Sequence, residues 1–333
     1  MTPTSNAARP HVVFVGLHHL WPSILADGLN ARFGAELRAS SFVQGAGTGS
    51  IPGFVKRLAT ADLVVRVGVT LDPASRLDRM FMATPRLRGR DCCALFWIGT
   101  DVLTHLRAYE SGTVPSKVAE ALKVMPSMAG AAHLADELAT AGVDAIAVPF
   151  PAPVLSAPDE VPPMPQRFTV LTYLPTGEGD RFRFYGGPQL LEAARSLPDV
   201  VFEVMGTGSI HGEELPGNVT LLGRVDDPAS AYRRASVVVR LVEHDAVGGT
   251  VMEGLLFGRR VVYTMPLPHT TTVGFGDVPG LVEALSGLKA RHDAGELTPD
   301  LEGQAWALTE FDPDVRFSRL KDVLLELVKR ARR

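Results

Sequence analysis

The sequence has little cysteine: Cys92 and Cys93 are its only two among 333 residues. Neighbours on a strand point to opposite faces, so this pair supplies neither a disulfide framework nor a zinc site. There is no run of 18 uncharged apolar residues, which predicts that no segment spans a membrane. The first residues also lack the basic start, long apolar core and small-residue cleavage site of a secretory signal. Together these absences predict a protein of the reducing cytoplasm.

Lysine is scarce, and positive charges do not outnumber negative ones. The formal net charge is −4 and the isoelectric point is about 6.1, which argues against a protein that holds nucleic acid through bulk positive charge. Only six residues are lysine, so arginine is the default cation for any phosphate site. The basic tail Lys329–Arg333 suits either a solvated end or peripheral contact with anionic lipid.

Several motifs for phosphates, metals and cofactors are missing. We find no Gly-Lys-Ser/Thr loop, no Gly-x-Ser-x-Gly elbow and no cluster with metal-ligand spacing. Gly206–Gly212 imitates a dinucleotide fingerprint, but that fingerprint needs a helix directly after its glycines. Here Glu213–Gly217 follows and a strand is predicted from Val219, which leaves no room for the helix. The sequence therefore excludes NAD, and we expect no metal and no cofactor.

The sequence does contain a regular alternation of short apolar runs and helix-like stretches. Continuous runs such as HVVFVG and CCALFWIG are typical of parallel strands covered by helices on both faces. This pattern predicts a doubly wound α/β domain over residues 1–150. Its predicted strands are His11–Gly16, Leu37–Val43, Leu63–Gly68, Cys92–Ile98, Lys123–Pro126 and Ala145–Val148, and its predicted helices are Pro22–Phe33, Gly53–Thr60, Pro73–Ala83, Thr100–Tyr109 and Gly130–Ala141.

The alternation then stops and starts again. Residues 149–165 contain seven prolines and no helical period, so we place a stiff linker at residues 151–166. A second α/β domain is predicted over residues 167–300. Two such domains predict a cleft between them, where a ligand binds at the carboxyl ends of the strands. The predicted strands of this half are Phe168–Leu174, Val200–Met205, Val219–Gly223, Ser236–Leu241 and Arg260–Thr264, and its predicted helices are Pro188–Leu197, Ala229–Arg234, Thr250–Phe257, Gly280–Leu288 and Val315–Lys329.

The segment Val238–Thr264 carries the most informative chemistry. A predicted strand ends near Leu241, a polar loop follows, and Gly248-Gly249-Thr250 leads into a helix. The two glycines let a ligand approach the backbone closely and expose the N–H groups of a helix start, which commonly bind a diphosphate. Asp245 and Glu253 are a carboxylate pair, one before and one inside the helix, that can accept hydrogen bonds from sugar or ribose hydroxyls.

This segment resembles the family 4 glycosyltransferases, which are retaining enzymes of the GT-B fold. Their pattern is a Glu, seven residues and a second Glu around a glycine-containing turn; here Asp245 stands at the first position and Glu253 at the second. The resemblance covers most of residues 90–265 and implies two Rossmann-like doubly wound domains facing a central cleft. It also implies that residues 301–333 cross back to the first domain. The other stretches that carry it are Phe96–Val102, residues 129–151, Val201–Gly208, Asn218–Val225 and Pro228–Ala235.

The resemblance implies a role for each matching position. In the second domain, Glu253 would bind the nucleotide ribose and Asp245 the transferred sugar. In the first domain, Gly16 would let the backbone approach the phosphates. The backbone positions implied for the diphosphate are Gly248, Gly249 and Thr250, and those implied for the base are Gly206, Gly208 and the Gly223–Val225 turn with Arg224 and Val225. The residues implied to face the acceptor are His18, His19, Trp21 and Asp101.

One region departs from the family pattern. The family offers an Arg and a Lys to the diphosphate just after the first strand of the second domain, where this chain reads YLPTGEGDRFRFYGG. Arg181 and Arg183 can supply the cations, because a guanidinium binds phosphate oxygens bidentately and stabilises a leaving diphosphate. Tyr185 stands near the expected Lys. Asp in place of Glu at position 245 also shortens the reach to the sugar by one methylene.

Structural roles compete with these functional ones. Asp245 and Asp101 could each cap a helix. Arg181 and Arg183 could be ordinary surface charge in a loop, and Trp21 could anchor the core. The position of Glu253, after a glycine turn between two buried strands, favours a role in a site.

The residues and the resemblance together imply a cytoplasmic, metal-independent and retaining glycosyltransferase, similar to the hexosyltransferases. The donor would be a nucleotide-diphosphate sugar, such as a UDP- or GDP-sugar, and the acceptor a sugar, glycan, lipid-linked or small molecule. One alternative is a nucleotide-sugar epimerase on the same fold, with His18, His19 or Asp101 as acid and base. Another is a non-catalytic nucleotide-sugar-binding or assembly protein, which the departures at Tyr185 and Asp245 motivate.

Overall fold

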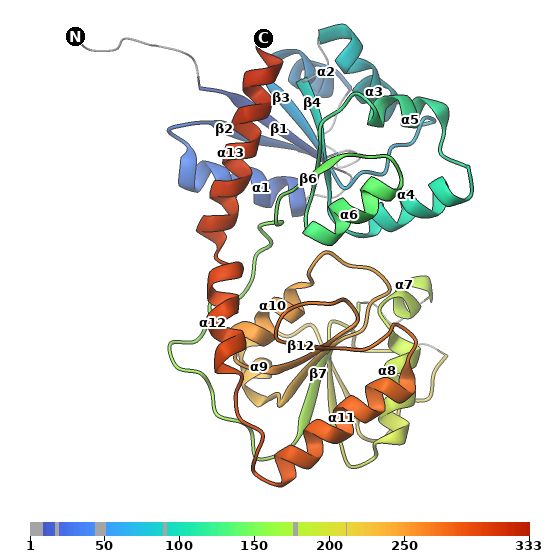
Figure 1. Ribbon diagram of the computed structural model, residues 1–333, viewed down its shortest axis with the longest axis vertical. Helices are drawn as coiled ribbons and strands as arrows, with labels where there is room; N and C mark the ends of the chain where they lie inside the picture. Colours follow the sequence, from blue (N-terminus) through green and yellow to red (C-terminus); the bar gives the residue numbers. More distant parts are fainter. Residues whose placement is uncertain (1–8, 17–19, 44–50, 89–91, 176–178, 211) are drawn as a thin grey trace, which may run out of the picture. The chain divides into compact units, whose positions relative to one another are not determined.

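The chain folds into two α/β units. The computed structural model describes residues 9–16, 20–43, 51–88, 92–175, 179–210 and 212–333. The amino-terminal unit comprises residues 1–152 and 313–333, and the carboxyl-terminal unit comprises residues 153–312. Within the described residues, each unit is built on one six-stranded parallel sheet (Figure 1). No helix in these ranges is long and apolar enough to cross a membrane.

The amino-terminal sheet has the strand order β2-β1-β3-β4-β5-β6. Every residue of β3 and β4 is buried, as the continuous apolar runs predict for strands covered on both faces. The strands are β1 (His11–Gly16), β2 (Arg38–Val43), β3 (Leu63–Val67), β4 (Cys93–Trp97), β5 (Ser127–Ala129) and β6 (Ala145–Ala147). The helices are α1 (Leu20–Phe33), α2 (Ile51–Thr60), α3 (Arg76–Arg88), α4 (Thr100–Glu110), α5 (Ser116–Leu122), α6 (Ala132–Thr140) and α13 (Pro313–Ala331).

One strand prediction in this unit is wrong. Residues Lys123–Pro126 are not a strand, and β5 begins at Ser127. The helix α5, which the sequence analysis did not predict, occupies the residues just before, and it buries Val118 and Leu122. Because Pro126 has no N–H to give to a ladder, the strand begins only after it.

Helix α13 completes the core of the amino-terminal unit. Its Leu320 and Leu324 are buried in the same cluster as strand residues such as Val12 and Val65. Figure 1 shows α13 lying beside α1. The two helices approach closely at Gly28, where an added Cβ would lie 2.1 Å from the Phe317 ring.

The carboxyl-terminal sheet has the order β12-β11-β10-β7-β8-β9. The chain starts at β7, builds one side through β8 and β9, and then crosses back to build the other side from β10. The strand order therefore reverses between β7 and β10, and ligands of such sheets bind outside the strand ends at this point. The strands are β7 (Thr169–Tyr173), β8 (Val201–Met205), β9 (Val219–Gly223), β10 (Val237–Arg240), β11 (Arg260–Tyr263) and β12 (Thr270–Thr272). The helices are α7 (Gly179–Phe184), α8 (Gly187–Ser196), α9 (Pro228–Arg234), α10 (Gly249–Leu256), α11 (Val278–Asp293) and α12 (Leu301–Glu310).

The proline-rich stretch packs against the carboxyl-terminal unit. The buried Arg259 donates to the carbonyl oxygens of Pro162 at 3.0 Å and Pro163 at 3.1 Å. Burial lowers the pKa of Arg259 to about 10. His292 Nε2 lies 2.8 Å from the carbonyl oxygen of Pro165. The residues predicted as a linker are thus held on this unit by side chains far away in the sequence.

Candidate functional site

The loops that follow β7 and β10 meet at the point where the strand order reverses. The backbone N–H of Glu243, after β10, donates to the Phe184 carbonyl at 2.9 Å. Gly186 has a φ of 65°, and a Cβ there would lie 2.4 Å from Leu241 Cβ. Only glycine combines that backbone conformation with so close an approach. This contact places Tyr185 beside the end of β10.

An ion pair between the buried Arg240 and the half-buried Asp245 lies at the end of β10. Arg240 Nη2 donates to Asp245 Oδ2 at 2.7 Å and its Nε donates to the same oxygen at 3.1 Å. The Arg240 guanidinium also lies 4.9 Å from the centre of the Tyr185 ring. Burial acts to lower the pKa of Arg240, but the Asp245 carboxylate outweighs it and raises the pKa. Asp245 is therefore anchored by a cation from the adjacent strand.

The sequence analysis missed Arg240, although a signal was present. The residue ends the apolar strand sequence VVVR, and a charge at the last position of a buried strand points to a paired or functional group. The sequence did not identify Asp245 as the partner of Arg240, because the loop that follows the strand brings the two side chains together.

Helix α10 begins next to this ion pair. Gly248 precedes the helix, and a Cβ there would lie 2.8 Å from both Arg240 Nε and Asp245 Oδ2. At Gly249, an added Cβ would meet no atom of the described residues within 4 Å, so the space beside the helix start is open. The first N–H groups of a helix have no partner inside it. The helix start at Gly249, with the positive end of the helix dipole, thus borders an open space.

Glu253 has two protein partners. Tyr232 Oη donates to Glu253 Oε2 at 2.6 Å, and the Leu155 N–H donates to Oε1 at 3.1 Å. Burial raises the pKa of Glu253, and these two hydrogen bonds oppose that shift. Each carboxylate oxygen keeps a second lone pair, so a ribose contact stays a prediction. The structure adds a role that the sequence did not show: Glu253 joins α9, α10 and the proline-rich stretch.

The two arginines expected in a loop lie instead on the short helix α7. Arg181 and Arg183 are both exposed, and the buried Phe182 between them packs against Gly187. The Arg181 guanidinium lies 5.8 Å from the centre of the Tyr185 ring. Tyr185 therefore has Arg181 and Arg240 within reach of its ring, and an aromatic face attracts such cations.

The residues predicted to border the base lie at the ends of β8 and β9. The Gly206 N–H donates to the Gly223 carbonyl at 2.8 Å, and the Gly223 N–H donates to the Thr207 carbonyl at 3.0 Å. Gly206 has a φ of 97° and Gly223 a φ of 62°, which favours glycine at both. Gly208, after β8, and Arg224, after β9, are exposed, and Val225 is half-buried. The sheet order β10-β7-β8-β9 thus puts the ends of β8 and β9 and the α10 start at one edge of one sheet.

Two predicted residues of the amino-terminal unit have structural partners. Trp21 is half-buried, with its ring 5.2 Å from that of Phe150, in keeping with a core anchor. Gly16 ends β1, where an added Cβ would lie 2.7 Å from Pro22 Cγ. His18 and His19 lie outside the described residues.

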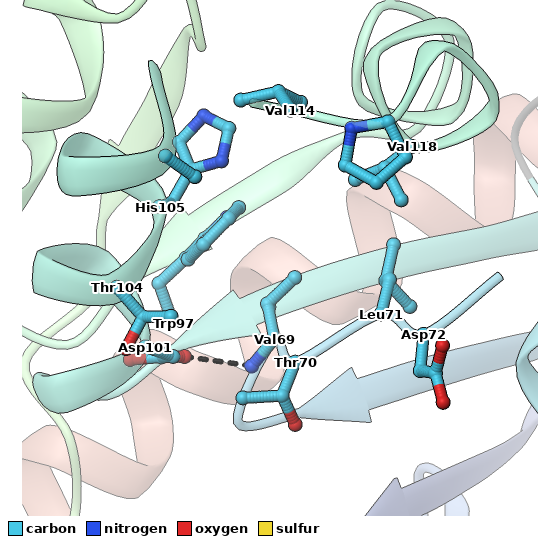
Figure 2. A pocket seen from close by; sticks show the side chains of 12 residues that line it. Val69, Thr70, Leu71, Asp72, Trp97, Asp101, Thr104, His105, Val114 and Val118 are labelled. Carbon is cyan, nitrogen blue, oxygen red and sulfur yellow. Dashed lines mark hydrogen bonds between the residues drawn. The ribbon is translucent and has the colours of Figure 1, made fainter. Parts of the chain in front are cut away.

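Asp101 is the third predicted residue of this unit with structural partners, and its buried carboxylate accepts several hydrogen bonds. Its carboxylate accepts from the N–H groups of Val69 at 2.7 Å, Ile98 at 3.0 Å, Gly99 at 2.8 Å and Val102 at 3.1 Å. Figure 2 draws the bond to Val69. Burial raises the pKa of Asp101, and these bonds oppose the shift. Asp101 therefore joins the loops after β3 and β4, and the acceptor contact implied for it stays a prediction.

The described residues hold no group of three or more His, Cys, Asp or Glu side chains placed to bind a metal ion. No protein-family model matches the chain, and no curated protein matches it either.

Solved structures do match it along nearly its full length. Sucrose-phosphate synthase from Thermosynechococcus elongatus superposes with a TM-score of 0.69 at 14% identity, covering 96% of this chain and 99% of that one. The apo form of the lipopolysaccharide outer core galactosyltransferase WaaB gives 0.63 at 13% identity, covering 95% and 99%. HepE from Anabaena, in complex with UDP and glucose, gives 0.62 at 14% identity, covering 94% and 98%.

At such low identity these likenesses establish the fold, and they agree with the strand orders described above. They confirm the fold class that the sequence predicts: this chain has the GT-B fold of these glycosyltransferases, with two Rossmann-like, doubly wound α/β domains.

Proposed function

We propose that the chain is a glycosyltransferase that moves a sugar from a nucleotide-diphosphate sugar to an acceptor hydroxyl. The observation that carries this proposal is the open start of α10 beside the Arg240–Asp245 ion pair, where the strand order reverses. A solved structure of the same fold, HepE, holds UDP and glucose. In this chain the donor would bind to the carboxyl-terminal unit.

Each part of the donor has a group that suits it. The N–H groups of Gly249 and Thr250 would hold the diphosphate. Gly206 and Gly208 after β8, with the Gly223–Val225 turn at the end of β9, would border the base. Glu253 would accept a hydrogen bond from the ribose through its remaining lone pairs.

The reaction needs negative charge to be stabilised on the leaving diphosphate. The bond from the anomeric carbon to the diphosphate oxygen breaks, and a bond to the acceptor oxygen forms. The α10 dipole and Arg181 or Arg183 would stabilise the departing oxygens. The acceptor proton would pass to a departing phosphate oxygen, so neither a separate base nor a metal ion is required. Retention of the anomeric configuration is part of the proposal.

Arg240 acts in this scheme as a positioning residue. Its two hydrogen bonds fix Asp245 Oδ2, and the other oxygen, Oδ1, accepts from the Ala246 N–H at 3.1 Å. Asp245 would therefore meet the sugar hydroxyls as a carboxylate that is already oriented.

A non-catalytic nucleotide-sugar binder is the second candidate. The structure favours it at one point: the two carboxylates expected to contact the donor are both engaged by protein groups, Asp245 by Arg240 and Glu253 by Tyr232. Such a protein would bind a donor and turn nothing over.

The test begins with binding. Nucleoside diphosphates and nucleotide sugars are screened by thermal shift, and a nucleotide that binds stabilises the protein by mass action. Glu253→Gln should weaken that stabilisation. Tyr232→Phe is the matched control, because it removes the same structural hydrogen bond and leaves the carboxylate. Equal stabilisation of all three proteins would exclude the ribose role.

Turnover separates the two candidates. The best-bound donor is incubated with a panel of sugar, glycan, lipid and small-molecule alcohols, and products are followed by mass spectrometry. The anomeric configuration is read by proton NMR, with and without EDTA. Binding without transfer to any acceptor favours the non-catalytic binder. An inverted product, or a reaction abolished by EDTA, would contradict the corresponding part of the proposal.

A further inference from the structure

The amino-terminal unit contains a cavity of about 210 Å³ at the carboxyl ends of β3 and β4 (Figure 2). Its floor and walls come from the loop after β3, from Trp97 at the end of β4, and from α4 and α5. The side chains that line its interior are mostly apolar: Val69, Leu71, Trp97, Val114 and Val118. Thr70, Thr104 and Pro115 also line the cavity and are exposed, which marks its open side.

One polar group in the lining lacks a partner. His105 is 9% exposed, and its Nε2 has no hydrogen-bond partner among the described residues. Burial lowers the pKa of His105, so the ring is neutral at neutral pH. Figure 2 shows this ring above the Trp97 side chain, and the two ring centres are 5.3 Å apart. A buried nitrogen without a partner is destabilising unless a ligand supplies one.

The remaining polar groups argue for a neutral ligand. The lining residues include no lysine or arginine, so an anion would find no counter-charge. The Asp101 carboxylate is already held by four backbone N–H groups. Asp72 is exposed, accepts from the Ala74 N–H at 2.7 Å, and in Figure 2 points away from His105. A charged group would therefore be desolvated here without a partner.

We propose that this cavity binds a neutral, single aromatic ring that carries one hydroxyl group, and that a turn of the His105 ring lets Nε2 hydrogen-bond to this hydroxyl. The size fits, since an engineered apolar cavity of about 150 Å³ holds benzene. A hydroxyl both donates and accepts, so it matches either tautomer of the histidine. The flat rings of Trp97 and His105 favour an aromatic partner. The inference uses residues of the amino-terminal unit alone and holds whether or not the chain transfers a sugar.

The test measures binding of phenol, benzene and cyclohexanol to the full chain by ligand-observed NMR, with no nucleotide present. Phenol should bind about fivefold more tightly than benzene, which is the effect of one neutral hydrogen bond, and more tightly than cyclohexanol. Val118→Trp fills the cavity and should abolish binding. Leu87→Trp, at a position 82% exposed on α3 of the same unit, is the matched control and should bind like the wild type.

A second variant tests the hydrogen bond itself. His105→Leu removes the unpaired nitrogen and puts an apolar side chain in its place, so the fold should be preserved. It should bind benzene as the wild type does and lose the preference for phenol. The proposal is overturned if phenol shows no saturable binding to the wild type, if Val118→Trp binds phenol unchanged, or if His105→Leu keeps the fivefold preference. Equal binding of cyclohexanol and phenol would overturn the aromatic specificity.

Discussion

Replacing Asp245 with alanine should destabilise the carboxyl-terminal unit strongly, because it leaves the Arg240 guanidinium buried without its counter-charge. The side chains of the pair are only 9% and 19% exposed, and the charged atoms are 2.7 Å apart. Removal of one partner of such a pair destabilises a protein by about 3–5 kcal/mol. The Tyr185 ring still faces the guanidinium, so we expect the lower end, about 3 kcal/mol.

A double-mutant cycle separates this loss from the net value of the pair. Arg240→Met removes the cation and keeps an apolar chain in its place. In the double variant no unpaired charge is left, so its destabilisation should be smaller than the sum of the two single values by about 2 kcal/mol. Because the chain has two units, global unfolding is not assured to be two-state. We would therefore measure hydrogen exchange of the peptides that cover β10 and α10.

Asp226→Ala is the control for this cycle, since Asp226 is an exposed aspartate of the same unit. If Asp245→Ala increases exchange no more than this control, or if the two single effects simply add, the ion pair is not the element that orders the site. Arg240 would then lose the positioning role given to it here.

Three further predictions follow from the packing and the titration of single residues. Gly248→Ala places a Cβ 2.8 Å from the ion pair and should lower the unfolding free energy by about 1–3 kcal/mol in chemical denaturation. Gly249→Ala places its Cβ in open space and should change the same free energy by about 0.5 kcal/mol or less. Burial lowers the pKa of His105, so the folded protein binds a proton at this residue less readily than the unfolded chain. The wild type should therefore lose stability as the pH falls below the pKa that His105 has in the unfolded chain. His105→Leu should lose less melting temperature than the wild type between pH 7.5 and pH 5.5, and an equal loss would contradict this. Leu320→Ala, at a fully buried position of α13, should destabilise the amino-terminal unit by about 3 kcal/mol, while Val315→Ala, at a position 59% exposed, should leave urea denaturation nearly unchanged.

The structure changes the interpretation of two carboxylates that the sequence marks for a site. Glu253 is hydrogen-bonded to Tyr232 and to the Leu155 N–H, so a loss of function in Glu253→Ala alone could reflect a displaced proline-rich stretch. Asp101 holds four backbone N–H groups and fixes two loops. Variants at both positions therefore need a control that breaks the same structural contact, such as Tyr232→Phe.

The sequence by itself determined the class of fold. Apolar runs buried on both faces are a local property, and so is the helical period between them; these patterns place most strands of both sheets to within a residue or two. Glycine turns are equally local, which is why the α10 start at Gly248-Gly249 was readable. Errors arose where a short element lacked a pattern of its own, as at β5, α7 and β12.

Only the tertiary structure decided which polar groups are partners. Arg240 meets Asp245 across a loop, Tyr185 reaches Arg240 through the contact of Gly186 with Leu241, and Arg259 holds prolines about a hundred residues earlier in the chain. The apolar cavity beside His105 likewise forms from segments that follow β3, β4 and α4. Such contacts depend on the order of strands in the sheet. No local pattern encodes that order, because it results from which apolar faces the complete chain can bury together.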